Sequence, residues 1–418
     1  MGMVSPLGTG LDKSWERLLT GQSGVGTITR FDTQNLRTQI AGEVEDFDPN
    51  SFVPPVFQEA DLFIQYALAA GGMAMAQAGL AIEDPAALPV AAERFGTIVG
   101  VACGGVGMIE SSIAHIEQRG AIGLSPYLIP SVIPNLAAGT LSMHFGLKGH
   151  CLCPATACSA GLNAIGEAYS LIRDNVIDAA LCGGAEACLT RTVVAGFSAL
   201  RALSAQSRNP QRASRPFDGR RDGLVLSEGV GLLVLEELSS AERRGTAILA
   251  ELVGYGASGD GYHVTTPDPN GDGAYRCMKM AIDESSRALS DFGYINAHGT
   301  STPHNDYIET EAIKKVFGNH AYKLSISSTK SSTGHLLGAA GGVEAIFTIL
   351  ALYHGKLPPT INFERVDPSE RPDYPFTCDR NLDYVPNVAR SKKVEFALCN
   401  AFSFGGTNAC IAVARWPH

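Results

Sequence analysis

The chain has 418 residues, and its 32 basic and 42 acidic side chains give a formal net charge of −10 at pH 7. Binding to nucleic acid or to an anionic membrane surface needs clustered positive charge, so this balance argues against both as partners. Charged residues are 18% of the chain and hydrophobic residues 45%, which excludes a disordered chain and supplies a large core. At about 150 residues per domain, the length predicts two or three domain-sized units.

The ten cysteines are scattered and form no CxxC pair. We therefore expect no zinc site, and most thiols should be small buried side chains in a reducing compartment. The uncharged run 120–147 is long, but Pro126, Pro130 and Pro134 exclude an ordinary membrane-spanning helix there. No basic and apolar leader precedes the first motif. The expectation is a soluble intracellular protein.

Apolar runs with strand character alternate with helical stretches of small residues. Helical spacing of apolar residues marks 62–80, whereas strands are expected at 95–102, 177–187, 229–238, 247–256, 292–298 and 324–330. This alternation predicts an α/β fold whose parallel sheets are covered on both faces. The last two runs, 394–402 and 408–416, predict an antiparallel hairpin instead.

A weak internal duplication suggests two similar halves. The segment TACSAGLNAIGEAYSLIRDN opens a helix with a turn of small residues, and STGHLLGAAGGVEAIFTILALYHGK repeats that design about 175 residues later. We therefore expect two α/β halves, 1–250 and 251–418, packed as one body.

Cys158 lies between a short apolar stretch and a helix, in PATACSAGLNAIG. Free N–H groups and the dipole at a helix N-terminus favour the thiolate, so a lowered pKa and a nucleophilic role are expected. The small neighbours of Cys158 leave room for a bulky acyl group.

His298 follows an apolar strand in YINAHGTSTP. Ligands bind at strand exits of parallel α/β sheets. Thr300 and Thr302 could therefore hydrogen-bond a polar arm of the substrate.

His335 opens a second helix, where a neutral imidazole can donate a hydrogen bond to a developing anion. Lys330, five residues earlier, is expected to pair with Glu344, Asp306 or Glu309.

Residues 400–408, NAFSFGGTN, place two phenylalanines before a double glycine. Gly405 and Gly406 permit a backbone that brings an N–H group close to a ligand. That N–H group, in the loop at Phe404, and the N–H of Cys158 would form an oxyanion hole for a thioester carbonyl.

Taken together, these segments resemble the elongating β-ketoacyl-[acyl carrier protein] synthases. The resemblance covers almost the whole chain through MVSPLG, TACSAG, ASRPFDGRRDGLVLSEG, NAHGTSTP, SSTKSSTGHLLGAAGGVEA and NAFSFGGTN. It implies a thiolase-like fold of two similar halves in a five-layered α-β-α-β-α arrangement, and a homodimer. It also implies a Cys-His-His triad of Cys158, His298 and His335, supported by Lys330.

The implied reaction is condensation of malonyl-carrier protein, with loss of carbon dioxide, onto an acyl group held by Cys158. Acyl carrier protein would be the partner, its phosphopantetheine arm would carry the substrates to Thr300 and Thr302, and no metal or other cofactor would take part. Cys103 stands where relatives often place a larger residue lining the acyl pocket, so medium to long chains are expected. Mitochondrial members look most similar, which suggests the mitochondrial matrix, with a bacterial cytoplasm as the alternative.

Two departures from the family pattern stand out. Ser403 replaces the usual glycine between the phenylalanines, which would stiffen any movement of Phe404. Segment 54–66 lacks the cations that relatives often place before it, so docking of an acidic carrier would use Arg201, Arg208 or Arg212.

Three alternatives share parts of this pattern. A biosynthetic thiolase would not show both histidine motifs, and a chain-length factor normally lacks the cysteine. An initiating synthase would have Asn in place of His335.

Overall fold

The computed structural model describes residues 1–80, 88–364 and 375–417, and its strands form two main sheets. The first has the order β2-β1-β8-β7-β5-β6. Its strands are β1 (Gly2–Ser5), β2 (Gly8–Thr9), β5 (Phe95–Gly100), β6 (Cys151–Leu152), β7 (Ala179–Glu186) and β8 (Gly229–Glu236). The second has the order β11-β10-β14-β15-β9. Its strands are β9 (Ala250–Gly259), β10 (Phe292–Asn296), β11 (Ser325–Ser327), β14 (Phe396–Phe402) and β15 (Thr407–Arg415).

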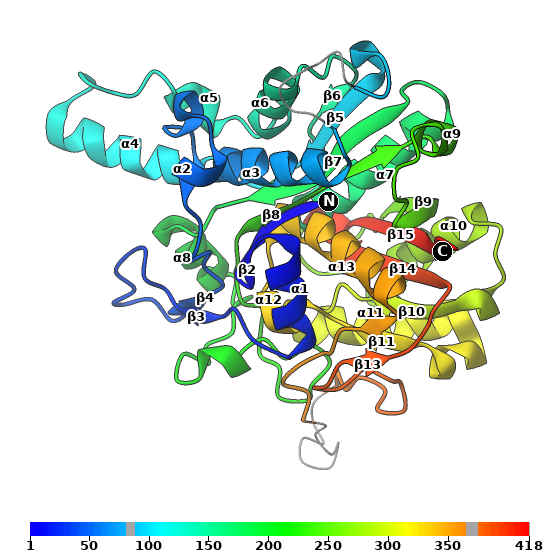
Figure 1. The fold of residues 1–418 in the computed structure, drawn as a ribbon. Helices are drawn as coiled ribbons and strands as arrows, with labels where there is room; N and C mark the ends of the chain where they lie inside the picture. The colour runs from blue at the N-terminus through cyan, green and yellow to red at the C-terminus, as the bar shows by residue number, and fades with distance from the viewer. Residues whose placement is uncertain (81–87, 365–374, 418) are drawn as a thin grey trace.

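Five layers are stacked, as expected for a thiolase-like α/β fold (Figure 1). Helices α7 (Ala160–Arg173) and α13 (Ala340–His354) lie between the sheets, where α7 contacts β5, β7, β9 and β15 and α13 contacts β7, β8 and β14. Helices α3 (Leu62–Gln77) and α6 (Leu136–Phe145) cover the outer face of the first sheet. Helices α10 (Asp272–Glu284) and α11 (Pro303–Phe317) cover the second.

The remaining elements surround these layers. The helices are α1 (Leu11–Leu19), α2 (Pro49–Phe52), α4 (Val106–Arg119), α5 (Leu128–Val132), α8 (Arg191–Ala199), α9 (Leu238–Arg243) and α12 (Lys330–Thr333). Two short ribbons pair β3 (Gly26–Thr27) with β4 (Ile40–Ala41), and β12 (Lys356–Leu357) with β13 (Arg390–Ser391).

Both main sheets are mixed, so the expectation of parallel sheets was wrong in part. Pairs β5–β7, β5–β6, β10–β14 and β10–β11 are parallel, whereas β7–β8, β1–β8 and β15–β9 are antiparallel. Burial on both faces produces the same continuous apolar runs in either direction, so the sequence pattern could not separate the two cases. The expected terminal hairpin is confirmed as β14–β15.

Glycines let the two central helices meet closely at their N-terminal ends. A Cβ added to Gly161 would lie 2.7 Å from the Gly338 carbonyl oxygen, and one added to Gly341 would lie 2.3 Å from the Leu162 nitrogen. A Cβ at Gly100 would lie 2.1 Å from Ala160, so β5 also contacts α7 backbone to backbone. These close approaches bring the segments before α7 and α13 together.

One stretch, Leu337–His354, is long and apolar enough by composition to cross a membrane. It is 83% buried inside the protein and contains α13. This burial between the two sheets is what a core helix requires.

Candidate active site

Cys158 lies in a single 3-10 turn, Ala157–Ser159, that leads directly into α7. The side chain is buried, with 7% of its surface exposed. The preceding residue, Ala157, has φ of 51°, a left-handed conformation that costs a residue with a Cβ about 1–2 kcal/mol. Such strain is typical of functional turns.

The expected lowering of the Cys158 pKa is not what the structure shows. Burial raises the pKa of the thiol to about 12, while the Lys330 cation and the backbone N–H of Phe404 oppose that rise. Sequence reasoning considered the helix terminus and missed the cost of removing a thiolate from water. The resting side chain is therefore the neutral thiol.

His298 and His335 come from the second half of the chain and face each other. His298 follows β10, and His335 is held between α12 and α13 by a backbone bond from its N–H to the Val225 oxygen, 2.7 Å. The ring centroids are 5.4 Å apart and the planes are nearly perpendicular. Burial lowers the pKa of each imidazole well below its usual range, and Lys330 adds to the effect. Both rings are thus neutral near pH 7.

Lys330 pairs with Glu344, one of the three acids expected. Both side chains are fully buried, and the ion pair joins α12 to α13. Burial raises the pKa of Glu344 to about 7 against the pull of Lys330. The pair ties the Lys330 cation to a fixed place in the site.

Glu309 and Asp306, the other two acids expected as partners of Lys330, lie on α11 and accept hydrogen bonds from backbone N–H groups instead. Glu309 accepts hydrogen bonds from the backbone N–H groups of His298 and Gly299, both at 2.8 Å, and so fixes the turn that carries the first histidine. Asp306 accepts from the Phe217 N–H at 2.9 Å and lies 3.5 Å from the buried Arg221 guanidinium. The two acids hold the backbone around the site.

The loop after β14 brings the backbone N–H of Phe404 to the Cys158 sulfur. The N–H groups of Gly405 and Gly406 bond to the carbonyl oxygens of Val264 and Ser403 instead. Phe404, the residue expected to contribute a backbone donor, is the one whose N–H faces the thiol. Gly405, at φ of 79°, makes the turn possible.

The three residues of the expected triad line one cavity of about 80 Å³. Cys158, His298 and His335 line it with Thr300 and Thr302, whose hydroxyl groups bond to each other at 2.9 Å. Every expected catalytic group except the deeper Lys330 thus opens onto one small space.

Sequence reasoning missed several wall residues of this cavity. Phe197 stacks on Phe404 at 6.0 Å between ring centroids, and the polar side chains Asp260, Asn305 and Asn408 also line the wall. They come from four distant segments. Asn408 ends the segment NAFSFGGTN discussed above, whereas the other three lie outside every motif named there. Cys103 does not line this cavity, but it packs against the apolar cluster that contains Cys158.

Comparisons with known proteins agree with this geometry. The model of the β-ketoacyl synthase N-terminal domain matches residues 1–241, and that of the C-terminal domain matches residues 249–364. A 3-oxoacyl-[acyl-carrier-protein] synthase 2 of Synechocystis sp. is 43% identical over 417 residues, covering 100% of this chain and 97% of the relative. The synthase of the same name from Coxiella burnetii is 44% identical over 416 residues, covering 99% and 97%.

Solved structures of ketosynthases are also similar to this chain. A β-ketoacyl synthase of Burkholderia phymatum has a TM-score of 0.88 at 32% identity, covering 100% of this chain and 98% of that one. A ketosynthase in complex with its acyl-carrier protein, from a type II polyketide synthase, also has a TM-score of 0.88 at 32% identity, covering 99% and 98%. The chain belongs to the β-ketoacyl synthase family.

Proposed function

We propose that this chain is an elongating 3-oxoacyl-[acyl carrier protein] synthase, which extends fatty acyl chains by two carbons. One observation carries the proposal: a single buried cavity joins a thiol, two neutral imidazoles and a backbone N–H aimed at the sulfur. The curated relatives at 43% and 44% identity over nearly the full chain bear the same activity in their names. The reaction needs no cofactor beyond the carrier-bound substrates, which agrees with membership of this family.

In the first step, the Cys158 sulfur attacks the thioester carbonyl carbon of an acyl-carrier protein. The carbonyl oxygen becomes an oxyanion, for which the N–H groups of Phe404 and Cys158 are the proposed donors. The thiol of the phosphopantetheine arm leaves, and the acyl group stays on Cys158. Because the resting group is a thiol, its proton must pass to the departing sulfur or to an imidazole.

In the second step, malonyl-carrier protein enters and loses carbon dioxide. The electron pair of the broken C–C bond forms an enolate, whose oxygen would accept hydrogen bonds from His298 and His335. Each Nδ1 is buried with no hydrogen-bond partner in the described part of the chain. A buried unpaired donor costs more than an unpaired acceptor, which favours the tautomer that carries its proton on Nε2. The carbanion then attacks the acyl-cysteine carbonyl and releases Cys158.

The chain-length-factor alternative is disfavoured by the same cavity, because a non-catalytic partner does not need a nucleophile beside two histidines. His335 is also the residue that an initiating synthase would replace with Asn. The test is incubation of the protein with an acyl-carrier protein and malonyl-carrier protein. We expect 3-oxoacyl-carrier protein and carbon dioxide in equal amounts, whereas a chain-length factor gives neither.

A homodimer remains a proposal, supported by one outward-facing surface. Helix α4 projects from the body of the protein (Figure 1) and has no buried residue. Ile109, Ile113 and Ile116 are exposed along it, at the spacing of one helix face. Strand β6, at the edge of the first sheet, has exposed side chains and one side that no described strand pairs with. Ile113→Glu should convert a dimer to a monomer in analytical ultracentrifugation.

The proposed partner of this protein is an acyl carrier protein. A solved relative is bound to its acyl-carrier protein, which supports the same class of partner here. Arg201 and Arg208 are exposed and suit an acidic carrier, whereas Arg212 is paired with Glu364.

The expected mitochondrial matrix has no support, since the relatives described above are bacterial, and we propose the bacterial cytoplasm instead.

A further inference from the structure

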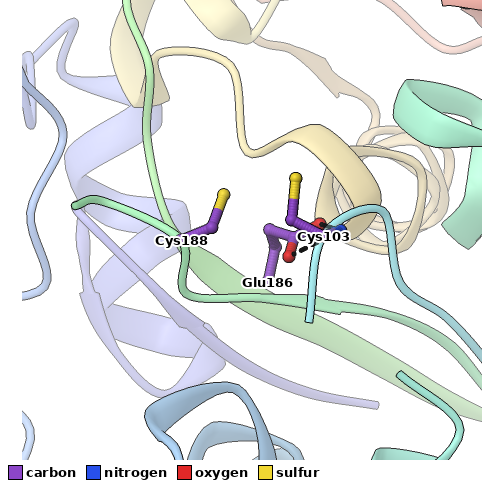
Figure 2. A group of neighbouring side chains, drawn as sticks. All are labelled: Cys103, Glu186 and Cys188. Atoms are coloured by element: carbon purple, nitrogen blue, oxygen red, sulfur yellow. Dashed lines mark hydrogen bonds between the residues drawn. The ribbon is translucent and has the colours of Figure 1, made fainter. Parts of the chain in front are cut away.

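Two more thiols lie together beside the cavity. Cys103, in the loop between β5 and α4, and Cys188, in the loop after β7, approach each other next to the Glu186 carboxylate (Figure 2). The Sγ atoms of Cys103 and Cys188 and one carboxylate oxygen of Glu186 all lie within 4.8 Å of one another. Figure 2 shows both sulfur atoms pointing to the same side, above the carboxylate.

Glu186 is a backbone anchor in this group, which makes it a poor metal ligand. Its Oε1 accepts from the N–H groups of Cys103 and Gly104, both at 3.2 Å. Its Oε2 accepts from the N–H groups of Ala102, Cys103 and Gly338 at 2.8, 3.2 and 3.3 Å. A carboxylate offers about four lone-pair sites, and these bonds fill them. The carboxylate therefore holds the Cys103 loop rigidly against the end of β7.

This anchoring fixes the two sulfurs in a pair. The sulfur atoms of Cys103 and Cys188 lie within 4.8 Å of each other. The nearby Cys103 thiol and burial raise the pKa of Cys188 above its usual range. Cys188 is buried, whereas Cys103 is partly exposed and is the one a small oxidant can reach. Both thiols pack in the apolar cluster that includes Cys158.

We propose that Cys103 and Cys188 are a modification site: a dithiol that a small peroxide converts reversibly to a disulfide beside Cys158. The thiol of Cys103 attacks one peroxide oxygen, the O–O bond breaks, and the products are a sulfenic acid and one water. The Cys188 sulfur then attacks the Cys103 sulfur, the S–O bond breaks, and the S–S bond forms. The proton of Cys188 joins the departing hydroxide as a second water.

The disulfide has a consequence that rests on the proposed function. Bonding the sulfurs draws two loops of the Cys158 cluster together and constrains the wall beside the nucleophile. Small displacements near a reacting group reduce rates steeply, so we expect the condensation rate to fall roughly two- to tenfold and to return on reduction.

The test treats the full chain with hydrogen peroxide, blocks the remaining thiols with N-ethylmaleimide and maps the peptides by mass spectrometry. We expect one peptide pair joined through Cys103 and Cys188, lighter by two hydrogen atoms and separated by dithiothreitol. Cys188→Ser and Cys188→Ala should each abolish the cross-link. Cys151→Ser, which removes the exposed cysteine on β6, should leave it unchanged. Oxidation of Cys103 to sulfinic acid without a cross-link, or cross-linking to another cysteine, would overturn the proposal.

Activity separates this inference from the proposed function. A cross-link that forms without changing the condensation rate contradicts the regulatory consequence. A cross-link in a protein with no condensation activity even when reduced leaves the disulfide in place and contradicts the proposed function. In the Cys188→Ser variant, peroxide should no longer cause the reversible loss of rate.

Discussion

His298 and His335 lie edge to face at 5.4 Å between ring centroids, although they are 37 positions apart in the sequence. Burial and the Lys330 cation both hold the two rings neutral. Two neutral rings cannot stabilise a thiolate as an imidazolium would, so they suit donation to an anion that forms later. Acyl transfer and decarboxylation should therefore depend on different groups.

His298 and His335 should be needed for malonyl decarboxylation but not for acyl transfer to Cys158. His298→Ala and His335→Ala should each still take up an acyl group on Cys158, because the N–H of Phe404 faces that sulfur. Loss of one oxyanion donor costs about 3–4 kcal/mol, so malonyl decarboxylation should fall about 10²–10³-fold in each variant. Intact-protein mass spectrometry measures acylation, and carbon dioxide release measures decarboxylation. An equal loss of acylation in both variants would contradict the assignment.

Alkylation of the resting enzyme should report the raised pKa of Cys158. Only the thiolate reacts with iodoacetamide, and burial sets the pKa at about 12. The labelling rate at Cys158 should therefore keep rising from pH 7 to pH 10, and Cys158→Ser should remove that label. A rate that levels off near pH 7 would instead indicate a thiolate in the resting site.

Removal of one partner of the buried Lys330–Glu344 ion pair should destabilise the protein more than removal of both. Lys330→Met leaves the Glu344 carboxylate buried and unpaired, which should lower the free energy of unfolding by about 3–5 kcal/mol. A lone buried acid is tolerated better when protonated, so the loss should be smaller at pH 6 than at pH 8. Urea denaturation measures both values. The double variant Lys330→Met/Glu344→Gln should recover most of the loss, and independent, additive effects would show that the pair is not coupled.

Ser403 should control how easily the Phe404 loop moves. Its hydroxyl donates to the Thr156 oxygen at 2.8 Å and contacts the Thr407 hydroxyl at 3.0 Å, which ties the loop to the turn before Cys158. Ser403→Gly removes these contacts and frees the backbone by about 0.5–1 kcal/mol. Alkylation of Cys158 at fixed pH should then be about two- to fivefold faster than in the parent protein, with Ser403→Ala in between. Identical rates in all three proteins would exclude a gating role.

Chain length tests the proposed place of Cys103 at the acyl pocket. Cys103→Phe should shorten the longest acyl chain that is accepted and leave short-chain condensation nearly intact, because a packed interior registers added volume. Cys103→Ser, which keeps the size, is the matched control. Competition among acyl-carrier proteins of different lengths measures the profile, and an unchanged profile in Cys103→Phe would place the pocket elsewhere.

Local sequence features marked Cys158, His298 and His335 as candidates, because each lies where a strand or turn leads into a helix. The structure places all three around one cavity, and their catalytic roles stay predictions. The similar openings of α7 and α13 suggested two similar halves packed as one body, but they did not predict that these helices contact each other between the sheets. The strand directions of β8 and β9 were not predictable, since a doubly buried strand has the same composition either way. The raised pKa of Cys158 and the anchoring by Glu186 depend on burial by segments distant in sequence, which no local pattern encodes. The division at about residue 250 stays a prediction.

The central claim is that acyl groups stay on Cys158 until a decarboxylated malonyl group removes them. The most direct test is a two-step experiment on intact protein: an acyl-carrier protein is added first, the complex is isolated, and malonyl-carrier protein follows. We predict one acyl group per chain, located at Cys158 by peptide mapping, that disappears on the second addition as 3-oxoacyl-carrier protein forms. An acyl group on another residue, or one that malonyl-carrier protein fails to remove, would contradict the account.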